Sequence, residues 1–190
     1  RLAVDCGGRA FLVGGTVRDM ILGRKITDLD VTVECDPSAL FEDLSKCYDV
    51  DVIKRSQFKT LKVRINEIVI DVAMSRSEKY NAEGALPTIY PSSLEEDLSR
   101  RDITVNAIAM SLDENSWGQV MDSHDGVSDL KSRTIRVLHR KSFEDDPTRI
   151  FRSNKYAYRL GFCLDPDTLD YLFAALIYLR NVSGKRITNE

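Results

Sequence analysis

Soft metal ligands are scarce in this sequence, which has two histidines and four cysteines among 190 residues. The cysteines (Cys6, Cys35, Cys47 and Cys163) are scattered, and none belongs to a C-x-x-C pair. Zinc sites need clustered ligands, so the sequence argues against a zinc protein. Scattered cysteines without a disulfide framework are typical of reduced, mostly buried thiols, and we expect a cytoplasmic protein.

Long hydrophobic runs and an excess of positive charge are also missing. No apolar stretch is long enough to span a bilayer and no signal sequence is visible, so we expect no membrane association. The formal net charge of −3 argues against an extensive RNA-binding surface within these residues. The length suits one sizeable domain, with or without a helical extension. Because the first residue is Arg1 rather than methionine, we expect a fragment.

A glycine turn follows the first apolar run of the chain. Residues 11–13 have strand character, Gly14 and Gly15 interrupt them, and residues 16–22 have helical spacing with Thr16 as the expected N-cap. Backbone N–H groups converge where a strand, a glycine turn and a helix meet. The segment therefore predicts an anion site.

Two carboxylates, Asp28 and Asp30, stand just downstream of this turn. Apolar and polar residues alternate from residue 28 to residue 33, as in a strand with one polar face, so both carboxylates share that face. Like charges this close repel unless a cation lies between them, and oxygen ligands of this kind suit Mg²⁺. A solvated strand face is the alternative interpretation.

The periodicity along the chain predicts the order β-α-β-α-β-β-β followed by helices. In the first half we expect a helix at 38–48, strands at 50–53, 60–65 and 68–74 with a tight turn at 66–67, and a long loop at 75–93. In the second half we expect a helix at 94–106, short strands at 108–112 and 118–121, and only helices beyond 141, with Gly161 and Asp165 at helix ends. A loop as long as 75–93 is more often functional than neutral.

Asp71 is a third candidate acid, because it interrupts an otherwise apolar strand. If its strand lies beside that of Asp28 and Asp30, two acids can hold metal and the third can orient or deprotonate an attacking hydroxyl, as in metal-assisted phosphoryl transfer. An acid at a solvated strand end is the alternative.

Two further segments combine arginines with acids. The first holds Arg100, Arg101, Asp102 and Asn106, which offer phosphate and ribose contacts or form an exposed helix end. The second is a helix with charged residues at intervals of three and four, which either binds a nucleobase or is a solvated, salt-bridged surface. Its charged residues are Asp145, Asp146, Arg149, Arg152, Lys155 and Arg159.

Four motifs in fixed order resemble the class II tRNA nucleotidyltransferase and poly(A) polymerase family, which includes the CCA-adding enzymes. They are G-G-T-V-R-D with D-L-D (14–30), R-R-D-I-T-V-N-A (100–107), D-G-V-S-D-L with I-R-V-L-H (125–139) and D-D-P-T-R-I-F-R (145–152). The resemblance implies an α+β polymerase-β-type head with a mixed sheet at 1–138 and an all-helical neck at 139–190. It also implies that the tRNA-gripping body of such enzymes would follow.

The resemblance also implies roles for individual residues. Asp28 and Asp30 would bind Mg²⁺, and Asp71 would be the third catalytic acid. Asp146 and Arg149 would pair with the edge of C or A. Nucleotide binding would involve Gly14, Gly15, Arg18, Arg101, Asp102, Asn106, Asp146, Arg149, Arg152 and Lys155.

Two positions depart from the family pattern. Asp145 replaces a glutamate, and Lys155 replaces an arginine, which keeps the charge but loses the bidentate fork. The implied activity is transfer of CMP and AMP from CTP and ATP to the 3′ end of tRNA. A CC-adding enzyme, an A-adding enzyme and a poly(A) polymerase are alternatives within the family, and a non-catalytic nucleotide-binding module is one outside it.

Overall fold

A mixed β-sheet forms the scaffold of the protein, for which a computed structural model describes residues 8–56 and 59–190. Its seven strands lie in the order β3-β4-β5-β2-β1-β8-β9, and β2 and β5 are parallel while the other pairs are antiparallel. The strands are β1 (Ala10–Val13), β2 (Leu29–Val33), β3 (Val50–Ser56), β4 (Thr60–Ile65), β5 (Ile68–Met74), β8 (Ala109–Ser111) and β9 (Val120–Met121). The predicted α+β class is confirmed.

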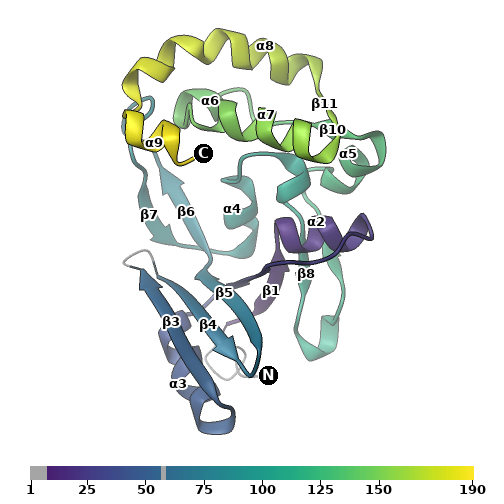
Figure 1. The fold of residues 1–190 in the computed structure, drawn as a ribbon, viewed down its shortest axis with the longest axis vertical. Helices are drawn as coiled ribbons and strands as arrows, with labels where there is room; N and C mark the ends of the chain where they lie inside the picture. The colour runs from purple at the N-terminus through teal and green to yellow at the C-terminus, as the bar shows by residue number, and fades with distance from the viewer. Residues whose placement is uncertain (1–7, 57–58) are drawn as a thin grey trace.

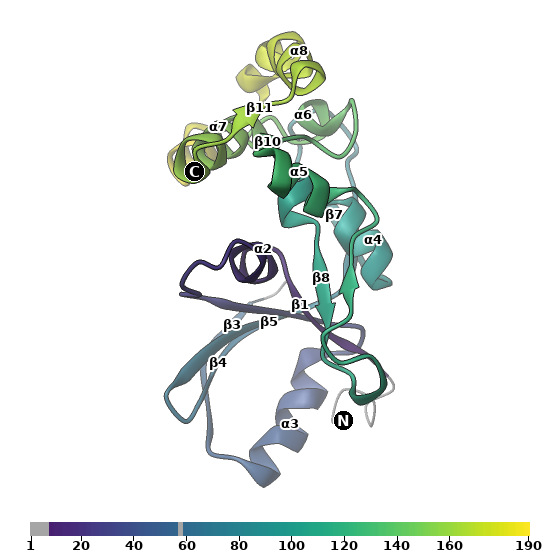
Figure 2. The same ribbon diagram turned by 90° about the vertical axis from the view of Figure 1, so that its right-hand side faces the viewer.

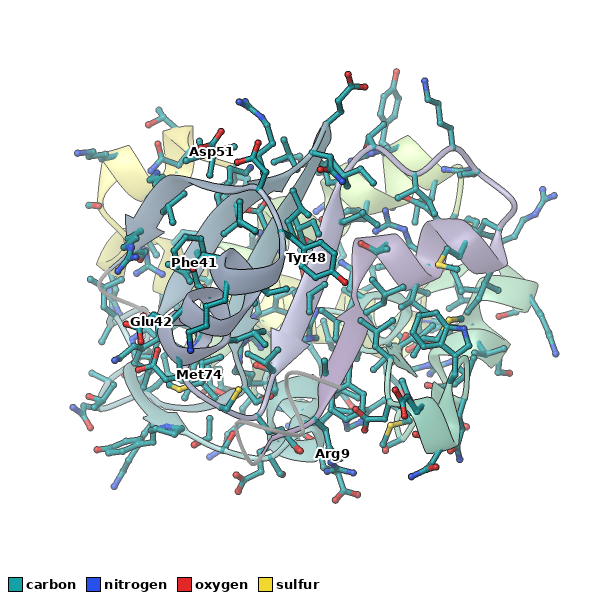
Figure 3. The ribbon with its side chains drawn as sticks, turned by 90° about the horizontal axis from the view of Figure 1, so that it is seen from below. Arg9, Phe41, Glu42, Tyr48, Asp51 and Met74 are labelled. Atoms are coloured by element: carbon teal, nitrogen blue, oxygen red, sulfur yellow. The ribbon has the colours of Figure 1, made fainter. Side chains whose placement is uncertain are left out.

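Helix α3 (Pro37–Cys47) covers one face of the β3-β4-β5 part of the sheet (Figures 2 and 3). Leu40 of this helix packs with Leu61, Val63 and Val72 of the strands in one buried cluster. Helix α2 (Gly15–Ile21) lies on the opposite side of the sheet (Figure 2). The period-2 alternation of β4 and β5 therefore separates a covered apolar face from an open polar face.

The C-terminal half stacks further elements beyond one end of the sheet (Figure 1). These are α5 (Gly126–Ser132), α6 (Ser142–Asp145), α7 (Arg149–Leu160), α8 (Pro166–Ala175), the 3-10 helix Leu176–Asn181 and α9 (Gly184–Thr188). Val17 and Ile103 from the first part of the chain share one buried cluster with Phe143, Ile150 and Leu172. The expected boundary between 138 and 139 stays a prediction.

The prediction of only helices beyond residue 141 is wrong. Strand β11 (Cys163–Leu164) follows α7 and pairs in parallel with β10 (Thr134–Ile135). The expected helix end is confirmed, because Gly161 caps α7 with φ of 71°. A two-residue strand is too short to show a periodic pattern in the sequence.

The prediction of a long loop at 75–93 is also wrong, because this segment contains a hairpin of β6 (Arg76–Lys79) and β7 (Thr88–Pro91). Strand β6 is polar, and Ile89 and Tyr90 of β7 are adjacent rather than alternating, so the sequence shows no strand pattern here. The single helix expected at 94–106 is two elements, α4 (Leu94–Ser99) and the 3-10 turn Thr104–Asn106. Helix α4 ends at Ser99, and between the two elements Ile103 is extended and bridges Val137.

The thiols differ from expectation as well. Cys163 is exposed and Cys35 is half-buried, so neither is the fully buried thiol that was expected. Cys6 and the side chain of Cys47 lie outside the described part of the structure. Within the described ranges, no helix is long and apolar enough to cross a membrane.

Candidate active site

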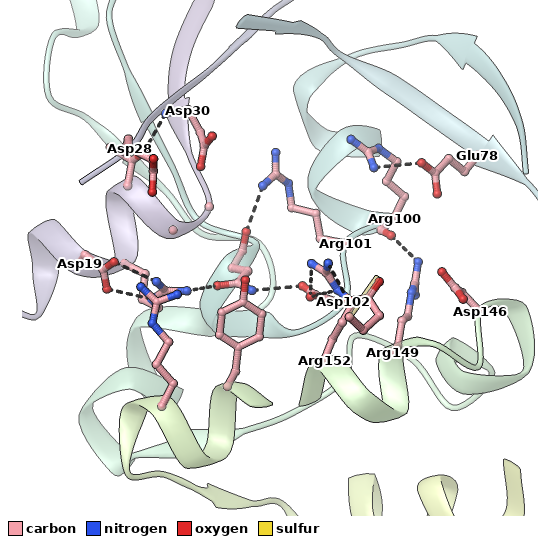
Figure 4. A pocket seen from close by; sticks show the side chains of 18 of the residues that line it. Asp19, Asp28, Asp30, Glu78, Arg100, Arg101, Asp102, Asp146, Arg149 and Arg152 are labelled. Atoms are coloured by element: carbon pink, nitrogen blue, oxygen red, sulfur yellow. Dashed lines mark hydrogen bonds and ion pairs between the residues drawn. The ribbon is translucent and has the colours of Figure 1, made fainter. Parts of the chain in front are cut away.

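A cavity of about 500 Å³ lies between the sheet and the C-terminal helices. Figure 4 shows Asp28 and Asp30 at one end of the labelled set and Asp146 and Arg149 at the other. Of the predicted site residues, those lining the cavity are Gly14, Gly15, Arg18, Asp28, Asp30, Arg101, Asp102, Asn106, Asp146, Arg149 and Arg152. Asp71 and Lys155 are not among its lining residues.

Thr16 connects the glycine turn to the acidic strand. Its hydroxyl donates to the Asp28 carbonyl oxygen at 3.0 Å and accepts from the Asp30 backbone N–H at 2.9 Å. Thr16 is therefore not the expected N-cap of α2, whose cap is Gly14. Gly14 has φ of 61°, and a Cβ atom there would lie 2.7 Å from Nη1 of Arg101. A side chain at Gly14 would displace this arginine.

Asp30 stands directly opposite Asp71 on the parallel strand β5. Burial raises the pKa of Asp30, and the negative charge of Asp71 raises this pKa further. Asp71 itself forms an ion pair with Lys62, whose Nζ lies 2.8 Å from Oδ2 of the acid. A cation at Asp28 and Asp30 would relieve the cost that the raised pKa reflects.

Two of the three carboxylates, Asp28 and Asp30, are therefore available to bind a metal ion, and Asp71 does not join them in a preformed three-acid site. In residues 8–56 and 59–190, no three His, Cys, Asp or Glu side chains lie close enough together to hold a metal ion. Mg²⁺ commonly takes one or two carboxylates together with substrate phosphates. Asp28 and Asp30 provide that set, whereas Asp71 is held by Lys62 in this structure.

A buried hydrogen-bonded chain runs across the cavity. Nη1 of Arg18 donates to Asn106 at 2.6 Å, and the Asn106 amide donates to Asp102 at 3.2 Å. Asp102 also accepts from Nε of Arg152 at 2.9 Å. Burial alone would raise the pKa of Asp102, but the charge and hydrogen bond of Arg152 lower it overall. The arginines are thus fixed before any ligand binds.

Asp97, which the sequence analysis missed, holds the two adjacent arginines. This fully buried acid lies 2.6 Å from Nη2 of Arg100 and 2.9 Å from Nη2 of Arg101. Burial opposes its ionisation, but Arg101 and Arg100 lower its pKa overall. The spacing of three and four residues before the arginines was the available signal.

Asp146 and Arg149 are already satisfied by protein groups. Oδ1 of Asp146 accepts from Thr148 and from Nη2 of Arg186 at 2.9 Å. The buried Arg149 donates to Ser142 Oγ at 2.7 Å and to the Arg100 carbonyl oxygen at 2.6 Å. A ligand that reads these two side chains must exchange hydrogen bonds with their present partners.

Arg186 is a second residue that the sequence analysis missed. Its Nη1 donates to the Gly84 carbonyl oxygen at 2.6 Å while its Nη2 bonds Asp146, so it links the β6-β7 hairpin to the far end of the cavity. The hairpin contributes Glu78, which pairs with Arg100 at 3.0 Å, and Tyr80. Burial raises the pKa of Tyr80, whose hydroxyl donates to Glu78.

Lys155, in contrast, donates to the Glu190 carbonyl oxygen at 2.8 Å. Its role in nucleotide binding stays a prediction, as do the roles of the residues that line the cavity.

Known proteins show the same arrangement over most of the chain. The poly A polymerase head domain matches residues 10–136. The A-adding tRNA nucleotidyltransferase of Aquifex aeolicus is 40% identical over 184 residues, which are 96% of this chain and 22% of that protein.

Two solved structures cover 99% of this chain. The apo form II of a CCA-adding enzyme has a TM-score of 0.94 at 33% identity, with 45% of that chain covered. A tRNA nucleotidyltransferase complexed with a primer tRNA and an incoming ATP analog has a TM-score of 0.86 at 36% identity, with 53% covered. This chain thus spans about a fifth to a half of the length of these relatives. From the domain match and the shared fold, the chain belongs to the poly A polymerase head domain family.

Proposed function

We propose that this chain is the catalytic part of a template-independent nucleotidyltransferase that adds CMP and AMP, from CTP and ATP, to the 3′ end of tRNA. One observation carries the proposal: a single cavity is lined by the carboxylates Asp28 and Asp30 and also by the polar pair Asp146 and Arg149. The relatives described as acting on tRNA support the choice of substrate. The cytoplasm is the proposed compartment.

Asp28 and Asp30 would hold Mg²⁺, which supplies charge neutralisation on the transferred phosphoryl group. Protein side chains would provide the other contributions to catalysis. Arg18 and Arg101 would bind the triphosphate and ribose, because Asn106 and Asp97 hold their guanidinium groups in place. Preorganised donors stabilise charge without reorganising during the reaction.

Asp71 would orient the attacking 3′-hydroxyl group or accept its proton. Its register opposite Asp30 places it beside the metal-binding pair. The ion pair with Lys62 occupies its carboxylate in the ligand-free protein. This step therefore requires Lys62 to move away from Asp71 or to share it with the primer.

Base selection is assigned to Asp146 and Arg149. Arg149→Lys keeps the positive charge but loses the planar fork that donates to a base edge. We expect about a 10-fold or larger loss in discrimination of CTP and ATP against UTP and GTP, because a base is rejected when it leaves buried polar groups unpaired. The measurement is kcat/KM for each of the four nucleotides.

Arg18→Lys is the matched control, since it also replaces an arginine of the cavity by lysine. It should weaken all four nucleotides by similar factors. An unchanged ratio among nucleotides in Arg149→Lys would contradict the assignment of base selection to this residue.

A-only addition is the second candidate. It is favoured by the 40% identity to an A-adding enzyme, whereas the CCA-adding structure is 33% identical. The test uses full-length protein, Mg²⁺ and two labelled tRNAs, one without CCA and one ending in CC. Extension of both tRNAs to CCA supports complete CCA addition, and extension of only the second with ATP supports A-only addition.

Long A tails would identify a poly(A) polymerase. Nucleotide binding without extension of either tRNA would reject the proposed enzyme in favour of a binding module.

A further inference from the structure

A row of four charged residues crosses the open face of the sheet. The cross-strand partners are Lys54 with Lys62, Lys62 with Asp71, and Asp71 with Asp30, on β3, β4, β5 and β2 in turn. Directly paired residues point to the same face of a sheet. The row therefore leads from the proposed metal-binding acid through two lysines to the outer strand β3, with Arg64 two residues further along β4 on the same face.

An irregularity in β3 places Lys54 in this row. Val52 pairs with the buried Val63 on the face that α3 covers, and regular alternation would put Lys54 on that face too. The register instead shifts between Val52 and Lys54, so that Lys54 stands opposite Lys62 and Arg55 stands opposite the buried Leu61. A β-bulge re-aims side chains in this way, and bulges are frequent next to active sites.

The pairing of Lys54 with Lys62 is unfavourable by itself, because like charges directly opposite each other destabilise a sheet. Lys62 relieves part of this repulsion through its ion pair with Asp71. Within residues 8–56 and 59–190, the side chains of Lys54 and Arg64 form no hydrogen bond or ion pair, and both are exposed. The open face therefore offers three cations beside the carboxylates. Asp51 stands opposite Arg64 in the strand register, but no ion pair joins these two side chains.

In the strand order, the cations on β3 and β4 lie on one side of β2, and β1, which leads into Gly14, lies on the other. Lys54, Lys62 and Arg64 do not line the cavity, whereas Gly14, Arg18 and Arg101 do. In phosphoryl transfer, the attacking and leaving oxygens lie roughly in line on opposite sides of the phosphorus. If a nucleoside triphosphate occupies the cavity, the RNA primer with its attacking 3′-hydroxyl group must approach from the side of Lys62.

We infer that Lys54, Lys62 and Arg64 form a binding surface for the phosphate backbone of the last nucleotides of the RNA primer. This inference deepens the proposed function and rests on it. Lys62 holds Asp71 in the ligand-free protein, and a primer phosphate exchanges with the carboxylate when the RNA end arrives. The lysines lead the RNA end to the carboxylates and take no part in nucleotide choice.

Protection of an exposed edge is the competing explanation, because β3 is an outer strand of the sheet and edge lysines prevent association between sheets. Arg55 offers a matched control. It is an exposed cation on the same strand, but it faces the side covered by α3, where its guanidinium carbon lies 5.6 Å from the centre of the Phe41 ring. Lys54 and Arg55 both lie on the outer strand β3, but only Lys54 is on the open face, whereas Lys62 is on the open face of the inner strand β4.

The experiment measures binding of labelled tRNA ending in CC to the full-length protein, without nucleotide, across a range of salt concentrations. Lys54→Met and Lys62→Met should each make the negative slope of log K against log salt shallower by about 0.7, which is about a fivefold loss of affinity at 0.1 M salt. Arg55→Met should leave the slope unchanged. The KM for ATP at saturating tRNA should be the same in wild type and Lys54→Met.

The inference is wrong if neither lysine variant changes the slope of log K against log salt, or if Arg55→Met makes this slope shallower by the same amount. Association of the lysine variants with an unchanged slope would establish edge protection instead. If wild-type protein binds tRNA but does not extend it, the proposed function is rejected. The salt dependence of tRNA binding in the variants would then still test the proposed binding surface. Wild-type protein that does not bind tRNA would overturn both.

Discussion

Asp30→Asn is expected to lower nucleotidyl transfer by about 100- to 1,000-fold or more, the loss typical for removal of one group that stabilises transition-state charge. The fold should be as stable as in the wild type or more stable. Burial and the charge of Asp71 raise the pKa of Asp30 in the folded protein, so its ionised form opposes folding above that pKa. Asparagine removes this charge and keeps the shape of the side chain.

Two measurements separate these effects: kcat/KM for ATP with a tRNA primer, and the free energy of unfolding at pH 7. Asp170→Asn is the control, because Asp170 is an exposed acid on α8 and does not line the cavity. It should change neither value appreciably. Wild-type turnover in Asp30→Asn would contradict the assignment of Asp30 to the metal.

Asp97→Ala should have the largest effect on stability, about 3–5 kcal/mol, because it leaves two arginines near the interior without their shared partner. Affinity for all nucleotides should fall as well, since Arg101 loses the contact that holds it at the cavity. Denaturant unfolding monitored by circular dichroism gives the first quantity, and titration with ATP gives the second.

The stabilisation by Asp97 should depend on pH. Its pKa is lowered in the folded protein, because Arg101 and Arg100 outweigh burial. Stability from this group is therefore present above the ordinary carboxyl pKa and is lost as the pH falls through the lowered value. Asp97→Ala should lack this component, and Glu95→Ala, an exposed acid on the same helix, should change stability by less than about 0.5 kcal/mol. A loss below about 1 kcal/mol in Asp97→Ala would contradict the anchoring role.

The parts of the site that follow a short periodic pattern could be predicted from the sequence. The alternation around Asp28 and Asp30 predicted a strand there, and β2 contains Asp30, whereas Asp28 directly precedes it. The apolar run around Asp71 predicted a strand for that acid, and β5 pairs with β2. The glycine turn and the helix that holds Arg149 and Arg152 also carry local signals.

The remaining features depend on long-range pairing. In the β6-β7 hairpin, β6 is polar and the apolar residues of β7 do not alternate, so no sequence pattern marks the pairing of the two strands. Arg186 reaches Asp146 from 40 residues away, and no local spacing marks such a contact. The shift in β3 that turns Lys54 to the open face depends on pairing with β4, which the sequence pattern of β3 alone does not contain.

The shared hydrophobic cluster limits how relatives of this protein can be recombined. Val17 in α2 and Ile150 in α7 belong to one buried cluster with Phe143. A chimera joined at residue 139 would therefore cut through packed side chains rather than through a linker, and both halves would need to match in shape. Exchanging the C-terminal helices alone would therefore disturb the packing as well as the proposed base-selecting residues. Substitution of Arg149, which lies outside this cluster, is the more practical way to test base choice.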